Sequence, residues 1–302
     1  MPAPVVVFGF NRPDVFGKTI RALKNNSLAT DTNLYIFIDG PRNEEDAPKV
    51  DDVVKIAHAV TGFKSVTVNA SPLNKGLANS IISGVTEIIK QYGRVIVVED
   101  DLIVATSFLT YMNQFLDKYE HDYRIFQVSG FGVKIKPPKD YNYDIYMHIR
   151  AQSWTWGTWK GRWETVDWKV SDFIELSRDK KKQRAFNEGG SDLFDMLKGY
   201  MNGINNSWYI RFNYSMFKQK KYAIVPVKSL VLNEGFGAEA THCNTYNRYK
   251  VDFQGEEKSF FTSPDTIEPD ARLYQQAVKY WSIRYRIYGK IMTLLYKLTK
   301  WG

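Results

Sequence analysis

The stretch that decides how this chain folds is RVIVVEDDLIV, residues 94–104. Four consecutive apolar β-formers at residues 95–98 run directly into three acids, Glu99, Asp100 and Asp101, and the chain then becomes apolar again. A buried strand that ends in three like charges needs a partner that neutralises them. A divalent cation is one candidate, because such ions prefer carboxylate oxygens. The alternative is a solvated turn whose acids cap the start of a helix.

The first 130 residues alternate short β-rich runs with helix-like segments. The β-rich runs are residues 5–10, 34–38, 65–68, 94–98 and 124–130, and the helix-like stretches between them lie around residues 15–23, 50–60, 77–92 and 107–119. This rhythm predicts an α/β fold with a parallel or mostly parallel sheet that is covered by helices.

Polar residues follow several of these strands at the point where each strand ends. They are NRP at residues 11–13, DGPR at 39–42 and EDD at 99–101. Ligands of such sheets bind beyond the carboxyl ends of the strands, so these residues mark the expected binding edge. No GxGxxG follows the first strand and no GxxxxGK[ST] occurs, which disfavours a dinucleotide fingerprint and a P-loop.

The rhythm changes after residue 130, where a Pro-, Tyr- and Lys-rich connection leads into the Trp-dense segment AQSWTWGTWKGRWETVDW, residues 151–168. We therefore expect an α/β half at residues 1–130, a less regular lobe at 131–270 packed on it, and a C-terminal helix at 271–302. No internal repeat is visible.

Composition indicates a folded globular protein, since 44% of the 302 residues are hydrophobic and 15% are aromatic. The single cysteine, Cys243, excludes an internal disulfide and a thiolate metal cluster and fits a reducing compartment. The N-terminal sequence MPAPVVVFGF lacks the features of a signal peptide, and no apolar stretch reaches the roughly 18 residues of a membrane span. The expected location is the cytoplasm.

The net charge of +8 comes almost entirely from the tail, because residues 271–302 contain seven bases and no acid. As one helix, this tail places apolar and aromatic residues on one face, namely Tyr280, Trp281, Tyr288, Ile291, Leu295 and Leu298. The bases lie opposite, except Arg284. Such a helix predicts peripheral membrane contact through residues 279–301, on the inner face of the membrane. The alternative is a helix docked on the protein by the same apolar face. Nucleic-acid binding is not expected, because the body has no matching basic patch.

Five motifs, in this order, resemble glycosyltransferases of the GT-A fold. They are VVVFGFNRPD (5–14), YIFIDGPRN (35–43), NKGLANSIISGV (74–85), VIVVEDD (95–101) and NEGFGAEATH (233–242). The likeness is greatest to the group related to N-acetylglucosaminyltransferase I and to bacterial family-2-like sugar transferases, and it covers about residues 4–243. It implies that residues 1–130 bind a nucleotide sugar and that residues 131–270 form the acceptor side.

By this resemblance EDD is the DXD-type motif. Asp101 would ligate Mn²⁺ or Mg²⁺ on the diphosphate of a nucleotide-sugar donor, most simply a UDP-sugar, with Glu99 beside it and Asp100 near the ribose. Asp39 would contact the base and Arg12 the nucleotide. The chemistry suits these residues, because a cation held by carboxylates stabilises the charge that develops on a leaving diphosphate.

Further residues are candidates at the same site. Lys75 is a possible second cation, or an exposed residue of an Asn-Lys-Gly turn. His242 would approach the metal by resemblance, or it is an ordinary histidine. Trp154, Trp156 and Gly157 match the Trp-Gly segment that walls the sugar pocket, although large aromatics also pack in cores. We expect the later tryptophans of that segment to lie in the core.

One expected residue is absent. Similar transferases place an aspartate near the Trp of INNSWYIRF (204–212) as the base that deprotonates the acceptor hydroxyl. Here Asn206 stands at that position, and Asp192, Asp195 and Glu234 are candidates for a displaced base. Two alternatives to a displaced base stay open, namely a mechanism that uses no base and a loss of activity.

The sequence therefore predicts a bacterial, metal-dependent glycosyltransferase of polysaccharide biosynthesis that acts on a glycan or glycolipid acceptor. The alternative is a non-catalytic protein that binds a sugar nucleotide or a glycan. A nucleotidyltransferase is a third interpretation, but FNRPDVFGK lacks the Gly-rich loop that it should show.

Overall fold

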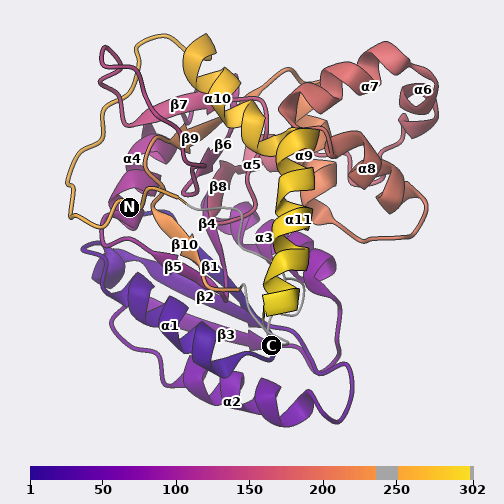
Figure 1. The fold of residues 1–302 in the computed structure, drawn as a ribbon. Helices are drawn as coiled ribbons and strands as arrows, with labels where there is room; N and C mark the ends of the chain where they lie inside the picture. Colours follow the sequence, from indigo (N-terminus) through magenta and orange to yellow (C-terminus); the bar gives the residue numbers. More distant parts are fainter. Residues whose placement is uncertain (236–250, 300–302) are drawn as a thin grey trace.

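The computed structural model describes residues 1–235 and 251–299. Its centre is an eight-stranded sheet in the order β3-β2-β1-β4-β8-β6-β9-β7 (Figure 1). The strands are β1 Val5–Gly9, β2 Asn33–Ile38, β3 Ser65–Ala70, β4 Arg94–Glu99, β6 Ile125–Ser129, β7 Ile145–His148, β8 Trp156–Trp159 and β9 Tyr222–Pro226. Only β8 and β7 run against the others, so the predicted mostly parallel α/β sheet is confirmed for the described residues.

Helices cover both faces of this sheet. On one face lie α1 Pro13–Lys24, α2 Ala47–His58 and α4 Phe108–Lys118, and on the other α3 Leu77–Tyr92, α9 Trp208–Lys218 and α10 Ala271–Trp281. A third apolar cluster joins α6 Phe173–Arg178, α7 Lys180–Phe186 and α8 Leu193–Met201 to α9, and it forms the projection at the upper right of Figure 1. The short α5, Lys160–Trp163, follows β8.

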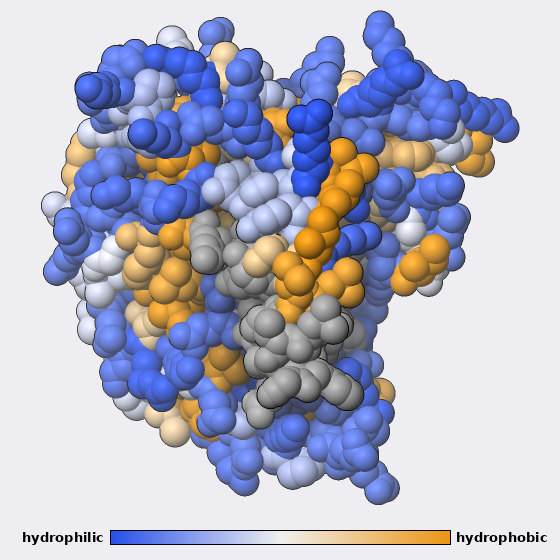
Figure 2. Space-filling view, in the orientation of Figure 1, coloured by the Kyte–Doolittle hydropathy of each residue, from blue (hydrophilic) through white to orange (hydrophobic). Residues whose placement is uncertain are grey.

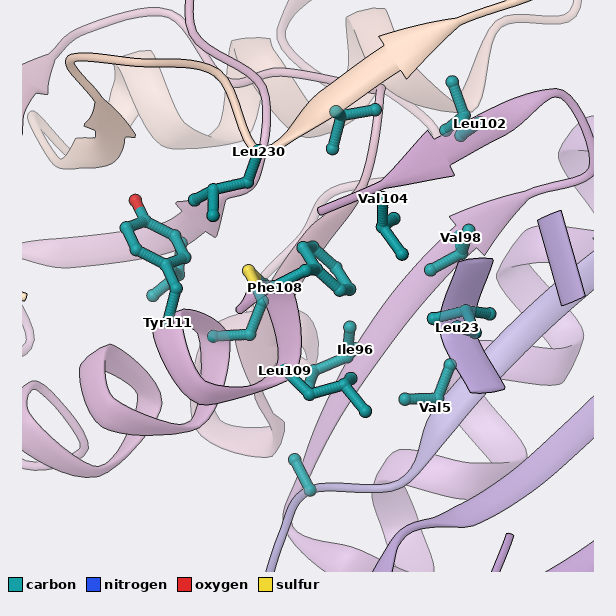
Figure 3. Packing of buried hydrophobic residues seen from close by; sticks show 14 of the residues in the cluster. Val5, Leu23, Ile96, Val98, Leu102, Val104, Phe108, Leu109, Tyr111 and Leu230 are labelled. Atoms are coloured by element: carbon teal, nitrogen blue, oxygen red, sulfur yellow. The ribbon is translucent and has the colours of Figure 1, made fainter. Parts of the chain in front are cut away.

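The two-sided cover explains the unbroken apolar run of β4. Successive side chains of a strand point to opposite faces. Ile96 and Val98 therefore enter the cluster under α1 and α4, while Val95 and Val97 enter the cluster under α3. Figure 3 shows the first of these clusters, in which Ile96 and Val98 lie close to side chains of the neighbouring β1 and of α1 and α4.

The Trp-rich segment forms a strand that the sequence did not predict. β8 lies between β4 and β6 and is antiparallel to both. Strands from both sides of residue 130 therefore share one sheet, and the division at residues 130 and 270 stays a prediction about organisation. A second small sheet pairs β5 Leu102–Val104 with β10 Val231–Asn233, which brings the start of the late NEG motif beside the acids that follow β4.

The C-terminal segment, predicted as one helix, is two helices. α10 docks on the body through Leu273, Ala277 and Trp281, and α11, Ile283–Thr299, follows after a break at Ser282. Ser282 has extended backbone, and its carbonyl and hydroxyl accept hydrogen bonds from the first turn of α11, as a helix cap does. Among the helices of the described residues, none has both the length and the apolar character needed to cross a bilayer.

Candidate functional site

A cavity of about 410 Å³ lies at the carboxyl ends of β1, β2 and β4. Its walls come from the segments that the sequence placed at this edge. They are Phe8, Gly9, Phe10, Arg12, Asp39, Arg42, Asn74, Gly76, Leu77, Ser80, Glu99, Asp100, Asp101, Trp154, Asn233 and Gly235. Pockets for small ligands and cofactors commonly have volumes of about 300–1,000 Å³, so a nucleotide-sized ligand is within range.

The acids after β4 have a partner in Arg12. Its Nη2 donates to Oδ1 of Asp100 and, at 3.1 Å, to Oδ2 of Asp101. This contact follows from the sheet, because β1 and β4 are neighbouring parallel strands and Arg12 comes just after the end of β1. Thr19 of α1 also donates to the main-chain oxygen of Asp100, at 2.8 Å. A guanidinium therefore supplies part of the neutralisation that the sequence required.

Arg12 does not balance the three acids completely. Burial, together with the charges of Asp101 and Asp100, raises the pKa of Glu99 to about 8. Burial also raises the pKa of Asp100 to about 6, although Arg12 acts in the opposite direction. Burial lowers the pKa of Arg12, but the two aspartates outweigh it and the pKa is raised. Burial is the main cause of both raised carboxylate pKa values, and the neighbouring acids add to it, so a single guanidinium does not offset the three acids.

Asp101 is the acid best placed for a cation. It lines the cavity with 15% of its side chain exposed, and a Cβ at position 235 would lie 2.1 Å from its Oδ2, so any larger residue there would displace the carboxylate. No group of three or more His, Cys, Asp or Glu within the described residues could hold a metal ion alone. His242 lies outside these residues. The donor set fits a cation that brings its remaining ligands with it, such as phosphate oxygens and water, and does not fit a closed metal cage.

Asp39 holds the loop that opens α3. Its carboxylate accepts hydrogen bonds from the main-chain N–H groups of Lys75 and Gly76, both at 2.8 Å, and of Gly40 at 3.1 Å. The loop needs Gly76, whose φ of +76° is unfavourable for other residues. Asp39 lines the cavity, but a contact with a base, which stays a prediction, would have to use the lone pairs that this loop leaves.

The cation that lines the cavity near this loop is Arg42 and not Lys75. The Lys75 side chain is exposed and is absent from the cavity wall. Arg42 lies over the ring of Phe10, with its Cζ 4.9 Å from the ring centroid, and its Nε donates to Asp46 at 2.7 Å. Arg42 belongs to the DGPR motif at residues 39–42, which the sequence had already placed at the binding edge.

Trp154 lines the cavity, but the structure corrects the assignments of Trp156 and Gly157. Trp156 is fully buried and stacks on Trp208 with 5.0 Å between ring centroids. Gly157 lies inside the sheet, where a Cβ would come within 3.1 Å of the main-chain oxygen of Val95. Both positions belong to β8, whose two faces are covered, and neither residue lines the cavity. Of the later tryptophans of this segment, Trp159 and Trp163 are buried in the core as predicted, and Trp168 is partly buried and packs against Trp163.

The position of the missing base lies next to the cavity. Asn206 lines an adjoining open pocket of about 450 Å³ that shares Gly76, Leu77 and Glu99 with the cavity. Its Oδ1 accepts a hydrogen bond from Nη2 of Arg211 at 3.2 Å. The structure therefore brings together the residues of the expected donor and acceptor regions, with an amide where a carboxylate was expected.

The candidates for a displaced base lie elsewhere or are engaged. Glu234 is half-exposed and pairs with Lys18 at 2.8 Å. Asp195 is exposed in the first turn of α8 and lines neither pocket. Asp192 is paired with Arg150, and although burial acts to raise its pKa, the charge and hydrogen bonds of Arg150 lower it. A carboxylate held in this way is a weak base.

The Arg150–Asp192 pair borders a second cavity, of about 230 Å³, which shares Trp154 with the first. Arg150 donates to both carboxylate oxygens of Asp192, at 2.8 and 3.0 Å, and to the hydroxyl of Tyr209 at 2.9 Å. Its guanidinium carbon lies 3.9 Å from the centroid of the Trp281 ring. This pair joins the loop before α8, the helix α9 and the end of α10.

Comparisons with known proteins give distant structural matches. No family model matches the chain, and no curated protein matches it. TarS of S. aureus has 16% identity over 48% of this chain, with a TM-score of 0.33, and the match spans a quarter (25%) of that protein. Mannose-1-phosphate geranyltransferase from Thermus thermophilus has 12% identity over 75% of this chain and 74% of its own, with a TM-score of 0.36.

A third match is glucosyl-3-phosphoglycerate synthase from Mycobacterium tuberculosis, in complex with Mn²⁺, UDP and glucosyl-3-phosphoglycerate. It has 13% identity over 42% of this chain and 43% of its own, with a TM-score of 0.29. All three TM-scores lie below 0.5 and all identities are low, so these matches assign neither a family nor a function to the chain. The resemblance to N-acetylglucosaminyltransferase I stays a prediction from sequence.

Proposed function

We propose that this protein is a metal-dependent glycosyltransferase that binds a sugar nucleotide, most simply a UDP-sugar, in the cavity at the carboxyl edge of the sheet. The observation that supports this most is the charge arrangement at that edge. Arg12 faces an acidic triplet that it does not fully neutralise, in a cavity of about 410 Å³. A divalent cation would bind the acids, and the diphosphate that it carries would face Arg12.

Different residues of the cavity would bind different parts of the donor. Asp101, with Asp100 beside it, would hold the cation, which supplies electrostatic stabilisation of the leaving diphosphate. Arg12 and Arg42 are the guanidinium groups that line the cavity, and each would donate to phosphate oxygens from its ion pair, Arg12 with Asp100 and Asp101 and Arg42 with Asp46. Trp154 offers an aromatic face for the sugar, and Phe10 lies under Arg42 on the nucleotide side.

The acceptor in this proposal is a glycan or a glycolipid that enters beside Asn206. Asn206 can donate or accept a hydrogen bond and so position a hydroxyl, but its amide cannot take up the proton. Because Glu234 and Asp192 are engaged with Lys18 and Arg150, neither is proposed as the base. This supports a second candidate function, a protein that binds the sugar nucleotide without transferring the sugar.

Two assays separate the candidates. Isothermal calorimetry with UDP and a panel of UDP-sugars in Mn²⁺ measures binding, and release of UDP in the presence of acceptor glycans and glycolipids measures transfer. The enzyme should show both, whereas the non-catalytic protein should bind a donor without releasing UDP. Absence of binding by UDP and every UDP-sugar would contradict both functions. Unchanged binding and turnover in Asp101→Ala would contradict the metal assignment.

A further inference from the structure

The helix α11 turns its apolar face away from the protein. Six of its large side chains are between 47% and 64% exposed: Ile283, Ile287, Tyr288, Ile291, Leu294 and Leu295. At about 100° per residue these positions share one face of the helix. Figure 2 shows them as a hydrophobic band along the front of the molecule, over the helix labelled α11 in Figure 1.

The opposite face carries the buried or half-buried residues of the helix, namely Tyr285, Arg286, Gly289, Met292 and Thr293. Gly289 is buried, and Thr293, one turn further on, uses its hydroxyl to bond the Gly289 carbonyl at 2.8 Å. Arg286 reaches the body, where its Nη1 donates to the hydroxyl of Ser191 at 3.4 Å. A surface helix ordinarily buries its apolar stripe. Its neighbour α10 does so with Leu273 and Trp281, so the outward apolar face distinguishes α11 from α10.

The charges around this face are positive. Arg284 and Lys290 are exposed on α11, and Lys279 is exposed in the last turn of α10. Residues 271–302 contain no acid at all. Two copies of the face placed together would bring these cations against one another, which disfavours self-association. Apolar side chains on a segment that contains cations and no acids are complementary to a lipid surface that carries negative charge.

We propose that α11 binds flat in the interface of a membrane that contains anionic lipids. At 17 residues and roughly 1.5 Å per residue, the helix is too short to span a bilayer, and so it would lie along the surface. Its apolar face enters the boundary between head groups and acyl chains, while Arg284, Lys290 and Lys279 contact lipid phosphates. The contact needs no catalytic activity, so its failure and the failure of the transferase proposal can be told apart.

This placement concerns the acceptor as well. Trp281 lines the second cavity beside Arg150 and Asp192, and α11 begins two residues later. A bound α11 therefore puts the wall of that cavity next to the lipid surface. Resting on the proposed transferase function, this favours a membrane-held glycolipid over a soluble glycan as the acceptor.

Vesicle sedimentation tests the contact with the full chain. We expect the unmodified protein to sediment with phosphatidylcholine vesicles that contain phosphatidylglycerol, and to bind pure phosphatidylcholine much less. Each of Arg284→Gln and Lys290→Gln should weaken binding to the anionic vesicles by about fivefold. The double variant Ile287→Ser with Leu294→Ser should lose binding, while Ile174→Ser, which changes an exposed apolar residue on α6, should keep it.

Three results would overturn the proposal. The first is an unmodified protein that binds neither kind of vesicle, a readout that needs no variant. The second is equal binding by the unmodified protein and the Ile287→Ser, Leu294→Ser variant, with unfolding temperatures that show both to be folded. The third is light scattering that shows a dimer of the unmodified protein and a monomer of the double variant, because α11 would then pair with a second copy.

Discussion

Two arginine–aspartate groups in this molecule differ in the number of acids that each arginine neutralises. Arg150 meets one carboxylate, Asp192, through two hydrogen bonds, and it is further held by a hydroxyl and an aromatic ring. Arg12 meets Asp100 and Asp101 through a single nitrogen, with Glu99 also close by. The pKa of Asp192 is lowered, whereas the pKa of Asp100 and of Glu99 is raised.

The difference separates a structural ion pair from a binding site. A one-to-one pair with its hydrogen bonds satisfied has no use for another ion, and breaking it leaves a buried charge. At the edge of the sheet three acids face one arginine, so a bound cation would be stabilised there. The repulsion between the acids reduces the folding stability of the free protein. We therefore expect changes at Arg150 to alter stability and changes at Arg12 or Asp101 to alter ligand binding.

The largest effect should follow from Arg150→Met. Asp192 would remain largely buried without its cation, so the free energy of unfolding should fall by about 3–5 kcal/mol. The double variant Arg150→Met with Asp192→Leu removes the orphaned charge and should recover much of that loss. Urea denaturation followed by circular dichroism measures both, and a single variant as stable as the double variant would show that the pair is not structural.

Asp101→Asn should behave in the opposite way. It removes a charge that repels Glu99 and Asp100, so the free energy of unfolding should change by less than about 1 kcal/mol. The affinity for UDP in the presence of Mn²⁺ should fall by about 10- to 100-fold, measured by calorimetry. Asp51→Asn, an exposed acid on α2, is the matched control and should change neither quantity.

Arg12→Gln should shift two affinities in opposite directions. Without the guanidinium, the acids after β4 are less neutralised, so Mn²⁺ alone should bind more tightly. UDP should bind about tenfold more weakly, because a charged hydrogen-bond donor to phosphate is lost. Arg21→Gln, on the exposed side of α1, serves as the control. If both affinities fell together, Arg12 would be acting through the fold and not through charge.

A smaller effect should appear at His148, whose Nδ1 accepts a hydrogen bond from the main chain of Arg150. Burial and then the charge of Arg150 lower its pKa to about 3. Below pH 6.5 the unfolded chain binds a proton there that the folded protein does not, so stability falls as the pH falls. Between pH 6.5 and 5.5 this contributes about 1 kcal/mol.

His148→Asn should remove that contribution, and the exposed His58→Asn should not. Urea titrations at the two pH values compare the three proteins. An unchanged pH dependence in His148→Asn would mean that this histidine titrates in the folded protein as it does in the unfolded chain.

Local patterns in the sequence predicted the sheet, because its strands are short apolar runs that end in polar residues. Residues 5–10 and 95–98 became β1 and β4, and EDD reached the expected edge. β8 was not predicted, because tryptophans in a Gly-containing segment indicate an aromatic wall as readily as a strand. Its position between β4 and β6 is a property of the whole sheet and not of the segment.

Contacts between residues that are far apart in the chain could not be predicted from the sequence either. Arg12 and Asp100 are separated by 88 positions, and only the pairing of β1 with β4 makes them neighbours. The break in the C-terminal segment was not predicted from the sequence either. A helical projection that treats it as one helix places Trp281 and Ile291 on a common face, but the break at Ser282 separates them, so Trp281 is buried and Ile291 is exposed.

The measurement that tests the central claim most directly is a Mn²⁺ titration followed by electron paramagnetic resonance of the free ion, with and without UDP. We expect Mn²⁺ to bind weakly to the protein alone and strongly when UDP is present. In Asp101→Asn we expect weaker Mn²⁺ binding than in the unmodified protein under both conditions. Mn²⁺ that binds as tightly without UDP as with it would contradict the account, because the site would then be a preformed metal centre. UDP that binds equally well without any divalent cation would also contradict it, because the cation would then have no part in holding the diphosphate.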